Sequence, residues 1–388
     1  MTTSSNDRTV PDEIDGWKPL LHALGASAED ALDRVRQRFE RRFRPDRRLH
    51  VVAFRGFGNR RAGSLSGRVL AYREPPDPDP GSLWHNLQQS YRRFETDEVP
   101  GVLVRATVDG AAPVEVRSDD EGYFSVDIEV PPDVEGTRLP VTLALPEHED
   151  AVVDGSAEIT LPGADARFGV ISDIDDTVLV TEATSILKMM RLTLLESSET
   201  RVAFPGVAAF YAALHADVNP FFYVSSSPWN LHEFLDDFMA VKGIVSGPML
   251  LRDFGLDRTK LIAGPHLEHK LGAIRSVLDR HPTLSFVLIG DSGQHDPEVY
   301  ADVVDAYPGR VLAVYIRDVS GDARDRAVGE IAARLDAAGV DLLLVPDTLA
   351  AARHAATRGW IAEDALERIR TDVGDELAPH LPLDRQSA

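Results

Sequence analysis

Cysteine is absent from the 388 residues, which excludes disulfides, thiolate catalysis and cysteine-ligated metal sites. Any metal bound by this chain must therefore take oxygen or imidazole ligands. Lysine is scarce as well, with five lysines against 36 arginines, so a lysine near other reactive side chains is informative. Long apolar runs are also missing. Stretches such as FVLIG and DLLLV are far shorter than the roughly 20 residues that a membrane-spanning helix needs.

Basic residues are outnumbered, and the formal net charge is −22 from 63 acidic and 41 basic side chains. This balance argues against a general nucleic-acid-binding protein, because phosphate backbones are bound by many lysines and arginines. The first stretch, MTTSSNDRTVPDEIDGW, is polar and acidic without an apolar core. We therefore expect a soluble, cytoplasmic protein, and peripheral membrane contact stays open.

One segment departs from this acidic average. After a flexible tail over residues 1–16, residues 17–49 predict a basic amphipathic helix with apolar side chains recurring on one face. From residue 33 to residue 73, thirteen arginines stand against three acidic residues, a net charge of about +10. Two interpretations follow: the helix binds an anionic membrane surface, or it packs on its own domain with solvated arginines.

Residues 50–165 contain short stretches of alternating polarity, separated by Gly, Pro and Asp turns. HVVAF, GVLVRATV, GYFSVDIEV and RLPVTLAL are examples. This pattern predicts a small antiparallel β-sandwich domain, interrupted by one helical insert at residues 82–94. The stretch SDDEGYF, residues 118–124, resembles a turn and strand of transthyretin-like sandwiches.

Strand and helix patterns alternate over residues 166–375, and a second tail is expected over 376–388. Five apolar runs are continuous, as in parallel strands buried on both faces: FGVISDI, PFFYVSS, SFVLIGD, VLAVYIRD and VDLLLVPD. Between them lie four helical segments, at residues 206–214, 228–240, 266–280 and 322–338. The predicted fold class is therefore α/β, with a doubly wound parallel sheet preceded by the β-sandwich.

Polar side chains gather where these strands end, which is where ligands bind in open α/β sheets. They are Asp173, Asp175, Asp176 and Thr177 after the first strand, Ser225, Ser226 and Ser227 after the second, Lys270 on a helix, and Asp291 and Asp296 in GDSGQHD. Carboxylates this close repel each other without a cation, and an oxygen-lined site favours Mg²⁺. The serine amides, near a helix with Pro228 at its first position, attract anions, and Lys270 adds a positive charge. Together these groups predict a phosphoryl-transfer pocket.

The same residues resemble the four motifs of the haloacid dehalogenase superfamily, in the same order along the chain. DIDDT resembles the DxDxT motif, Ser225 after FFYV resembles the second motif, Lys270 the third, and GDSGQHD the GDxxxxD form of the fourth. Over about residues 165–320, stretches such as GVISDIDDTV and FFYVSSSPWNL are similar to the actin-patch phosphatidate phosphatase family, a relative of the lipins. Bacterial members of that family carry a β-rich region before this domain, as this chain does.

Two features qualify the resemblance. Asp176 stands where lipins have glycine, and an aspartate at this place agrees with the narrower family. The proline-rich tails that recruit actin-associated partners to yeast members are absent, so that role is not implied, and protein partners stay unknown.

The resemblance implies an Mg²⁺-dependent phosphatase that acts through an aspartyl phosphate. Asp173 is the implied nucleophile, and Asp175 the implied acid that protonates the leaving alkoxide and then activates water. Mg²⁺ would bind the carboxylates of Asp173 and Asp291 and the backbone carbonyl of Asp175. The remaining implied roles are phosphoryl binding for Ser225, Ser226 and Lys270, loop support for Thr177, and orientation of Lys270 or a metal-bound water for Asp296.

The implied substrate is phosphatidate, a phospholipid, hydrolysed to diacylglycerol and phosphate. Little chain remains between the first two motifs for a cap domain, and a weakly capped pocket admits bulky substrates. Two alternatives stay open: a soluble phosphomonoester as substrate, or a non-catalytic binding module or adaptor. Residues 178–196, rich in Leu and Met, fit either an apolar flap against lipid or an ordinary buried helix.

Overall fold

The computed structural model describes residues 48–71, 99–154, 157–174, 205–252, 264–319 and 322–377. All of these described residues belong to one compact unit. Most of the predicted basic helix, the insert at 82–94 and the segment 178–196 lie outside the described residues. The predicted domain boundary between residues 165 and 166 stays a prediction.

The first described region, residues 48–160, is made of strands and is called the β-rich region below. Its nine strands are β1 (Leu49–Ala53), β2 (Gly56–Gly58), β3 (Ala62–Ala71), β4 (Leu103–Thr107), β5 (Val114–Arg117), β6 (Tyr123–Glu129), β7 (Arg138–Ala144), β8 (Val152–Asp154) and β9 (Ala157–Thr160). They form one sheet in the order β5-β4-β7-β9-β2-β3-β1-β8, with β6 beside β3. Burial alternates along β6 and β7, as the period-two pattern predicts.

The expectation of a purely antiparallel arrangement was wrong. β8 pairs with β1 and β9 pairs with β2 in parallel, while the other strand pairs of this sheet are antiparallel. Parallel pairs arise because β8 and β9 return beside strands from the start of the region instead of closing hairpins with their chain neighbours. The short strands β2 and β8 were not predicted, since three residues carry too little periodicity to be recognised.

Several arginines of the basic run contact the β-rich region itself. Arg55 forms an ion pair with Glu158 at 2.9 Å. Arg60 donates to three backbone carbonyls, and the guanidinium of Arg68 lies 4.4 Å from the ring centroid of Tyr123. These three arginines follow the predicted helix, so the two interpretations of that helix stay open, because the arginines before residue 48 lie outside the described residues.

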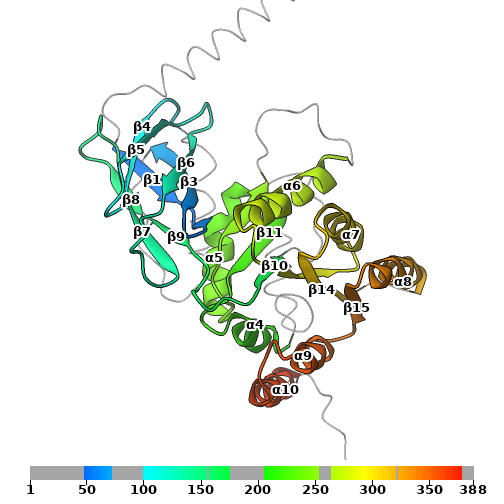
Figure 1. The fold of residues 1–388 in the computed structure, drawn as a ribbon. Coiled ribbons are helices and arrows are strands. Elements are labelled where there is room, and N and C mark those ends of the chain that lie inside the picture. Colours follow the sequence, from blue (N-terminus) through cyan, green and yellow to red (C-terminus); the bar gives the residue numbers. More distant parts are fainter. Residues whose placement is uncertain are drawn as a thin grey trace, which may run out of the picture. The chain divides into compact units, whose positions relative to one another are not determined.

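The second region contains a six-stranded parallel sheet (Figure 1). Its strands are β10 (Gly169–Asp173), β11 (Phe221–Pro228), β12 (Met249–Arg252), β13 (Phe286–Asp291), β14 (Val311–Arg317) and β15 (Asp341–Val345). The order across the sheet is β12-β11-β10-β13-β14-β15, which confirms the predicted α/β class with a parallel sheet. Successive strands are added outward from β10 to one side and then from β13 to the other, so the order reverses between β10 and β13. Ligands of such sheets bind at this switch point, beyond the carboxyl ends of the strands.

Helices cover both faces of this sheet. They are α4 (Val207–His215), α5 (His232–Val241), α6 (Gly264–Arg280), α7 (Asp296–Ala306), α8 (Asp322–Ala337), α9 (Thr348–Thr357) and α10 (Glu363–Leu377), with a 3-10 turn at Trp229–Leu231. Adjacent residues of one strand point to opposite faces, so Phe221 and Tyr223 pack with α4, α5 and α9, and Phe222 and Val224 pack with α6, α7 and α8.

The second strand ends differently from the prediction. Pro228 is the last residue of β11 and not the first residue of a helix, because α5 begins only at His232, after the 3-10 turn. The serines 225–227 therefore lie in the last part of β11, where its pairing with β12 is irregular. Among the described residues, no helix has the length and apolar character needed to cross a membrane.

Candidate active site

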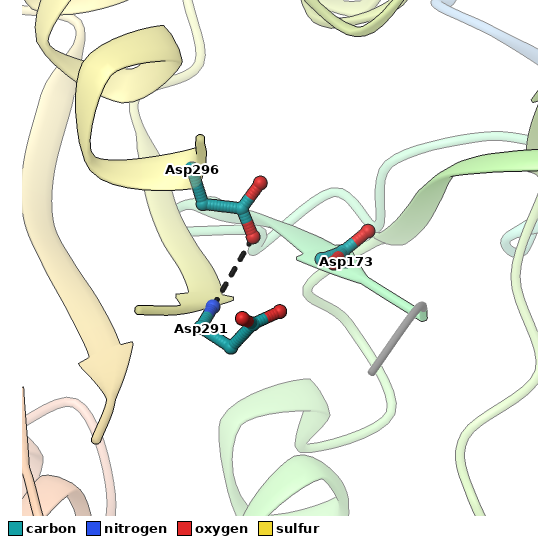
Figure 2. A group of neighbouring side chains, drawn as sticks. All are labelled: Asp173, Asp291 and Asp296. Carbon is teal, nitrogen blue, oxygen red and sulfur yellow. Dashed lines mark hydrogen bonds between the residues drawn. The ribbon is translucent and has the colours of Figure 1, made fainter. Parts of the chain in front are cut away.

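Three carboxylates meet at the switch point of the parallel sheet (Figure 2). Asp173 is the last residue of β10 and Asp291 is the last residue of β13, and these two strands pair directly. Asp296 is the first residue of α7. One oxygen from each carboxylate lies within 4.8 Å of the others. The predicted convergence of the first and fourth motifs is thus present in the structure.

Asp296 reaches this cluster because Gly290 has no side chain. One oxygen of Asp296 accepts a hydrogen bond of 3.1 Å from the backbone N–H of Asp291. A Cβ atom on Gly290 would lie only 2.8 Å from the carboxyl carbon of Asp296, closer than such atoms can approach. Asp296 is fully buried, and its position depends on this close packing against β13.

Lys270, on α6, lies between two of the carboxylates. Its Nζ is 3.0 Å from Oδ1 of Asp173, and it also forms a short ion pair with Asp296. Burial alone would lower the pKa of Lys270, but the charges and hydrogen bonds of Asp173 and Asp296 outweigh burial and raise it above its usual value. The lysine therefore stays positively charged inside a buried site.

Asp291 is held by the loop that follows β13. The N–H groups of Gly293 and Gln294 donate to its Oδ1, at 2.7 and 3.1 Å. Burial, followed by the charge of Asp296, raises the pKa of Asp291 to about 6, although the two N–H donors and Lys270 oppose the shift. Three carboxylates with one lysine thus leave an excess of negative charge, which favours a bound cation.

The chemistry of these donors fits Mg²⁺. The group offers buried carboxylate oxygens from Asp173, Asp291 and Asp296, and hard oxygen ligands are those that Mg²⁺ prefers. Asp173 and Asp291 are two of the predicted metal ligands, and that role stays a prediction. The third predicted ligand, Asp175, lies outside the described residues, as do Asp176 and Thr177.

Ser225 and Ser226 come from the neighbouring strand β11. Ser225 is fully buried, and its Oγ accepts a hydrogen bond of 2.9 Å from the N–H of Ser227. Ser226 is partly exposed. The strand β11 lies directly beside β10, so the serine turn, residues 225–227, follows the same edge of the sheet as Asp173.

A cavity of about 150 Å³ opens beside the carboxylates. Asp173 and Asp291 line it together with apolar side chains such as Phe210, Phe238 and Met239. A dry cavity of about 150 Å³ in another protein holds one benzene molecule. The cavity lined by the described residues is therefore large enough for a small apolar group.

Two further side chains contribute to the site without a motif that could have revealed them. The Tyr211 hydroxyl is 2.7 Å from Oγ of Ser172, next to Asp173, and burial raises the pKa of this phenol to about 12. Arg324 on α8 donates to the backbone carbonyls of Ser292 and Gln294, at 3.0 and 2.6 Å, and pairs with Glu298. Arg324 thereby fixes the loop between Asp291 and Asp296 from outside.

The chain is similar to known proteins over the region that contains this site. Residues 168–318 match a family model described as phosphatidate phosphatase APP1, catalytic domain. This segment belongs to the APP1-type family. The matched range of the APP1-type domain contains all four described members of the cluster, Asp173, Lys270, Asp291 and Asp296.

Two curated relatives extend beyond that range. Phosphatidate phosphatase APP1 of Saccharomyces cerevisiae is 28% identical over 253 residues, which are 62% of this chain and 42% of the relative. An uncharacterized protein of Schizosaccharomyces pombe is 31% identical over 218 residues, covering 53% of this chain and 35% of the relative. The chain therefore spans less than half the length of the curated relatives it matches.

Solved structures offer only a distant likeness. A carbohydrate acetylesterase from Xanthomonas citri is 12% identical, with coverage of 66% of this chain and 65% of that chain, and a TM-score of 0.24. A likeness of this size has no bearing on the fold or the chemistry of the APP1-type domain.

Proposed function

We propose that the chain is an Mg²⁺-dependent phosphatase with a haloacid dehalogenase-like catalytic domain, and that it hydrolyses phosphatidate to diacylglycerol and phosphate. The observation that carries the proposal is the meeting of Asp173, Lys270, Asp291 and Asp296 at the switch point of the parallel sheet. These residues come from β10, α6, β13 and α7, and nothing in ordinary core packing requires four buried charges in one place.

The catalytic steps follow from the position of Asp173. A carboxylate oxygen of Asp173 attacks the phosphorus, the bond from phosphorus to the ester oxygen breaks, and the leaving alkoxide takes a proton from Asp175. A water molecule then attacks the same phosphorus, Asp175 takes its proton back, and the carboxylate of Asp173 is released with inorganic phosphate. The assignment of Asp175 rests on the DxDxT resemblance.

The charges around Asp173 support this chemistry. Lys270, whose Nζ lies 3.0 Å from the Asp173 carboxylate, offers positive charge to the phosphoryl oxygens. The serine turn offers a hydroxyl and N–H groups on the neighbouring strand. Asp173 and Asp291 would hold Mg²⁺, which supplies charge neutralisation at the phosphoryl group when bound. Asp296 orients Lys270 and the backbone of Asp291.

The lipid substrate is supported by the similarity to the yeast phosphatidate phosphatase and by the apolar lining of the cavity next to Asp173. A soluble phosphomonoester is the second candidate. One observation favours it: Val319 is the one large apolar side chain that is exposed among the described residues.

Phosphate release tests the proposal. The full chain is incubated with Mg²⁺ and either phosphatidate in mixed micelles or a panel of soluble phosphomonoesters, with Asp173→Asn as the blank. We expect selective turnover of phosphatidate and a loss of at least about a thousandfold in Asp173→Asn, since the nucleophile is removed. Turnover of soluble esters alone would refute the lipid substrate, and no turnover of either would favour the binding module.

A further inference from the structure

The β-rich region contacts the APP1-type domain through one aromatic stack. Phe54 follows β1, and its ring lies 4.4 Å from Trp229 at an interplanar angle of 20°. The same ring lies 4.6 Å from His232. Phe54 is 2% exposed, and Val52 and Leu70 complete the cluster around it. Trp229 is therefore held by side chains from a part of the chain that precedes the catalytic domain.

Trp229 directly follows the serine turn. Val224 pairs with Leu250 and Pro228 pairs with Arg252, and the register of β11 and β12 shifts between these two pairs. Residues 225–227 therefore lie where regular pairing with β12 is interrupted, so the ladder does not fix their backbone. The residues that flank the turn therefore contribute to its position, beside hydrogen bonds of the serines themselves such as that from the N–H of Ser227 to Oγ of Ser225.

The anchors differ at the two ends. Before the turn, Val224 pairs with Asp173 in the register of β10 and β11 and lies in a fully packed core. After the turn, the next anchored side chain is Trp229, which packs on Phe54. A shift of Trp229 would move the backbone of the serine turn, because only Pro228 lies between Ser227 and Trp229.

The same corner of the β-rich region also contacts the helix that carries Lys270. The side-chain amide of Asn59 donates to the carbonyl of Arg280, at 2.6 Å, and a ring nitrogen of His281 lies 2.9 Å from the carbonyl oxygen of Gly58. Both contacts are at the carboxyl end of α6, ten residues after Lys270. Residues 54–59 thus contact both elements that bring phosphate-binding groups to the site.

We propose that Phe54 is a positioning residue for the phosphate-binding serine turn and acts through Trp229. The β-rich region is then a part of the catalytic unit and not a separate binding module. The inference rests on the proposed function, since it assigns phosphate binding to the serine turn. The ligand chemistry concerned is a tetrahedral oxyanion, either the phosphoryl group of the substrate or the released inorganic phosphate.

Inorganic phosphate is the probe for this inference. Its affinity for the full chain in the presence of Mg²⁺ is measured by calorimetry and as competitive inhibition of ester hydrolysis. Phe54→Leu keeps an apolar side chain but removes the stacked ring, and we expect phosphate to bind about tenfold more weakly, which corresponds to about 1.4 kcal/mol. Phe54→Ala should weaken phosphate binding more than Phe54→Leu does, and Trp229→Phe should weaken it less. If Phe54→Ala does not fold, the other two variants still test the inference.

Leu143→Ala is the matched control. Leu143 is buried in the other hydrophobic cluster of the β-rich region, so its truncation opens a cavity in the same region away from the stack. We expect it to lower the unfolding temperature and to leave the phosphate affinity within twofold of wild type. Equal weakening by Leu143→Ala and Phe54→Leu, or unchanged affinity in Phe54→Leu, would overturn the inference.

A double-mutant cycle tests the route through Trp229. If Phe54 acts through the indole, Phe54→Leu combined with Trp229→Phe should weaken phosphate binding by less than the product of the two single effects. Multiplicative effects would overturn this route. A wild-type chain that binds phosphate but hydrolyses no ester refutes the proposed function alone, and one that binds no phosphate refutes the positioning role.

Discussion

Lys270 separates two buried carboxylates, and its charge makes their proximity tolerable. Its ammonium group is 3.0 Å from Asp173 and is also paired with Asp296. Removing one partner of a buried ion pair leaves an uncompensated charge, which costs far more than losing a surface pair. The stability of the chain and the chemistry of the site are therefore coupled at this one side chain.

Lys270→Met should lower the free energy of unfolding by about 3–5 kcal/mol and abolish phosphate release. Added Mg²⁺ should recover more stability in the variant than in wild type, because a divalent cation can replace the missing positive charge. Urea unfolding with and without Mg²⁺ measures both effects. Lys242→Met, at an exposed position, is the control, and an equally small loss in both variants would contradict the prediction.

His232 makes the stability of the chain dependent on pH. Burial, followed by the charge of Arg55, lowers the pKa of His232 to about 3. Between pH 6.5 and about 3 the unfolded chain binds a proton that the folded chain does not, so the free energy of unfolding falls as the pH falls through this window. The full contribution is present above pH 6.5.

Replacing this imidazole by an apolar ring should remove its share of the acid sensitivity. At pH 5.5 the unfolded histidine is protonated, so wild type should lose about 1.4 kcal/mol more stability than His232→Phe on going from pH 7.5 to 5.5. Urea unfolding at the two pH values measures the difference. His148→Phe, at an exposed position, should behave as wild type, and equal slopes in wild type and His232→Phe would refute the assignment.

At the residue scale, sequence reasoning succeeded where a motif marks the end of a strand. Asp173, Lys270 and Asp291 lie together in the structure. The apolar runs predicted where the two strands end, and the motif spacing predicted the lysine. Tyr211 and Arg324 were missed, because each reaches the site from a helix whose sequence has no distinctive pattern. Their contacts depend on packing that only the folded chain defines.

The loop and helix after β13 determine where Asp296 lies. Gly290 allows the carboxyl group to approach, and Arg324 fixes the loop from its outer side. This arrangement explains why a strand, a short loop and the first residue of α7 can place two carboxylates within reach of one cation.

Gly290→Ala should displace Asp296 and lower phosphate release by at least about tenfold, because the added Cβ would overlap the carboxyl group. Lys270 would then lose its ion pair with Asp296, so the affinity for phosphate should also fall. Gly272→Ala on α6 is the control: no atom lies within 4 Å of its added Cβ, and alanine should stabilise the helix by about 0.5–1 kcal/mol. Comparable activities of the two variants would argue against the role of Gly290.

At the scale of elements, the continuous apolar runs predicted five strands of the parallel sheet within a few residues, and the segments between them predicted four of its helices. β12 was missed, since its four residues resemble many short apolar stretches. The start of the helix after β11 was also misplaced. Proline is common in the first turn of helices. Pro228 instead ends a strand, because β11 pairs with β12 as far as this residue.

At the scale of the whole molecule, charge is unevenly distributed along an acidic chain. The arginines from residue 55 to residue 68 make contacts within the β-rich region. The arginines before residue 48 remain the candidates for contact with an anionic lipid surface. Sequence alone could not divide the basic run in this way, because the partners of its second half are far along the chain.

Arg41→Gln combined with Arg44→Gln should weaken binding of the full chain to phosphatidate-containing vesicles, by about 1 kcal/mol for each arginine. Co-sedimentation at low and high salt measures this, and high salt should reduce the difference. Arg368→Gln with Arg370→Gln, at exposed positions of α10, removes the same charge elsewhere. Equal binding of the two double variants to the vesicles would contradict the membrane interpretation. Hydrolysis of soluble esters should be unchanged in both variants.

The contact between the β-rich region and the APP1-type domain could not be predicted from the sequence. Phe54 ends an ordinary apolar stretch and Trp229 follows a polar turn, and nothing in either local pattern indicates a shared cluster. Period and composition describe single elements, whereas an interface depends on the shapes of two surfaces that are far apart along the chain.

The order of strands in the parallel sheet also has a consequence for biosynthesis. β10 emerges from the ribosome long before its neighbour β13, since Gly169 pairs with Phe286 more than a hundred residues later. Until β13 is translated, one side of β10 is an unpaired edge that can recruit another nascent chain. The carboxylates of Asp173 and Asp291 are likewise kept apart during this interval, so their mutual repulsion arises only at a late stage of folding. The growing chain therefore passes through a period of aggregation risk that ends when β13 pairs with the strand that carries Asp173.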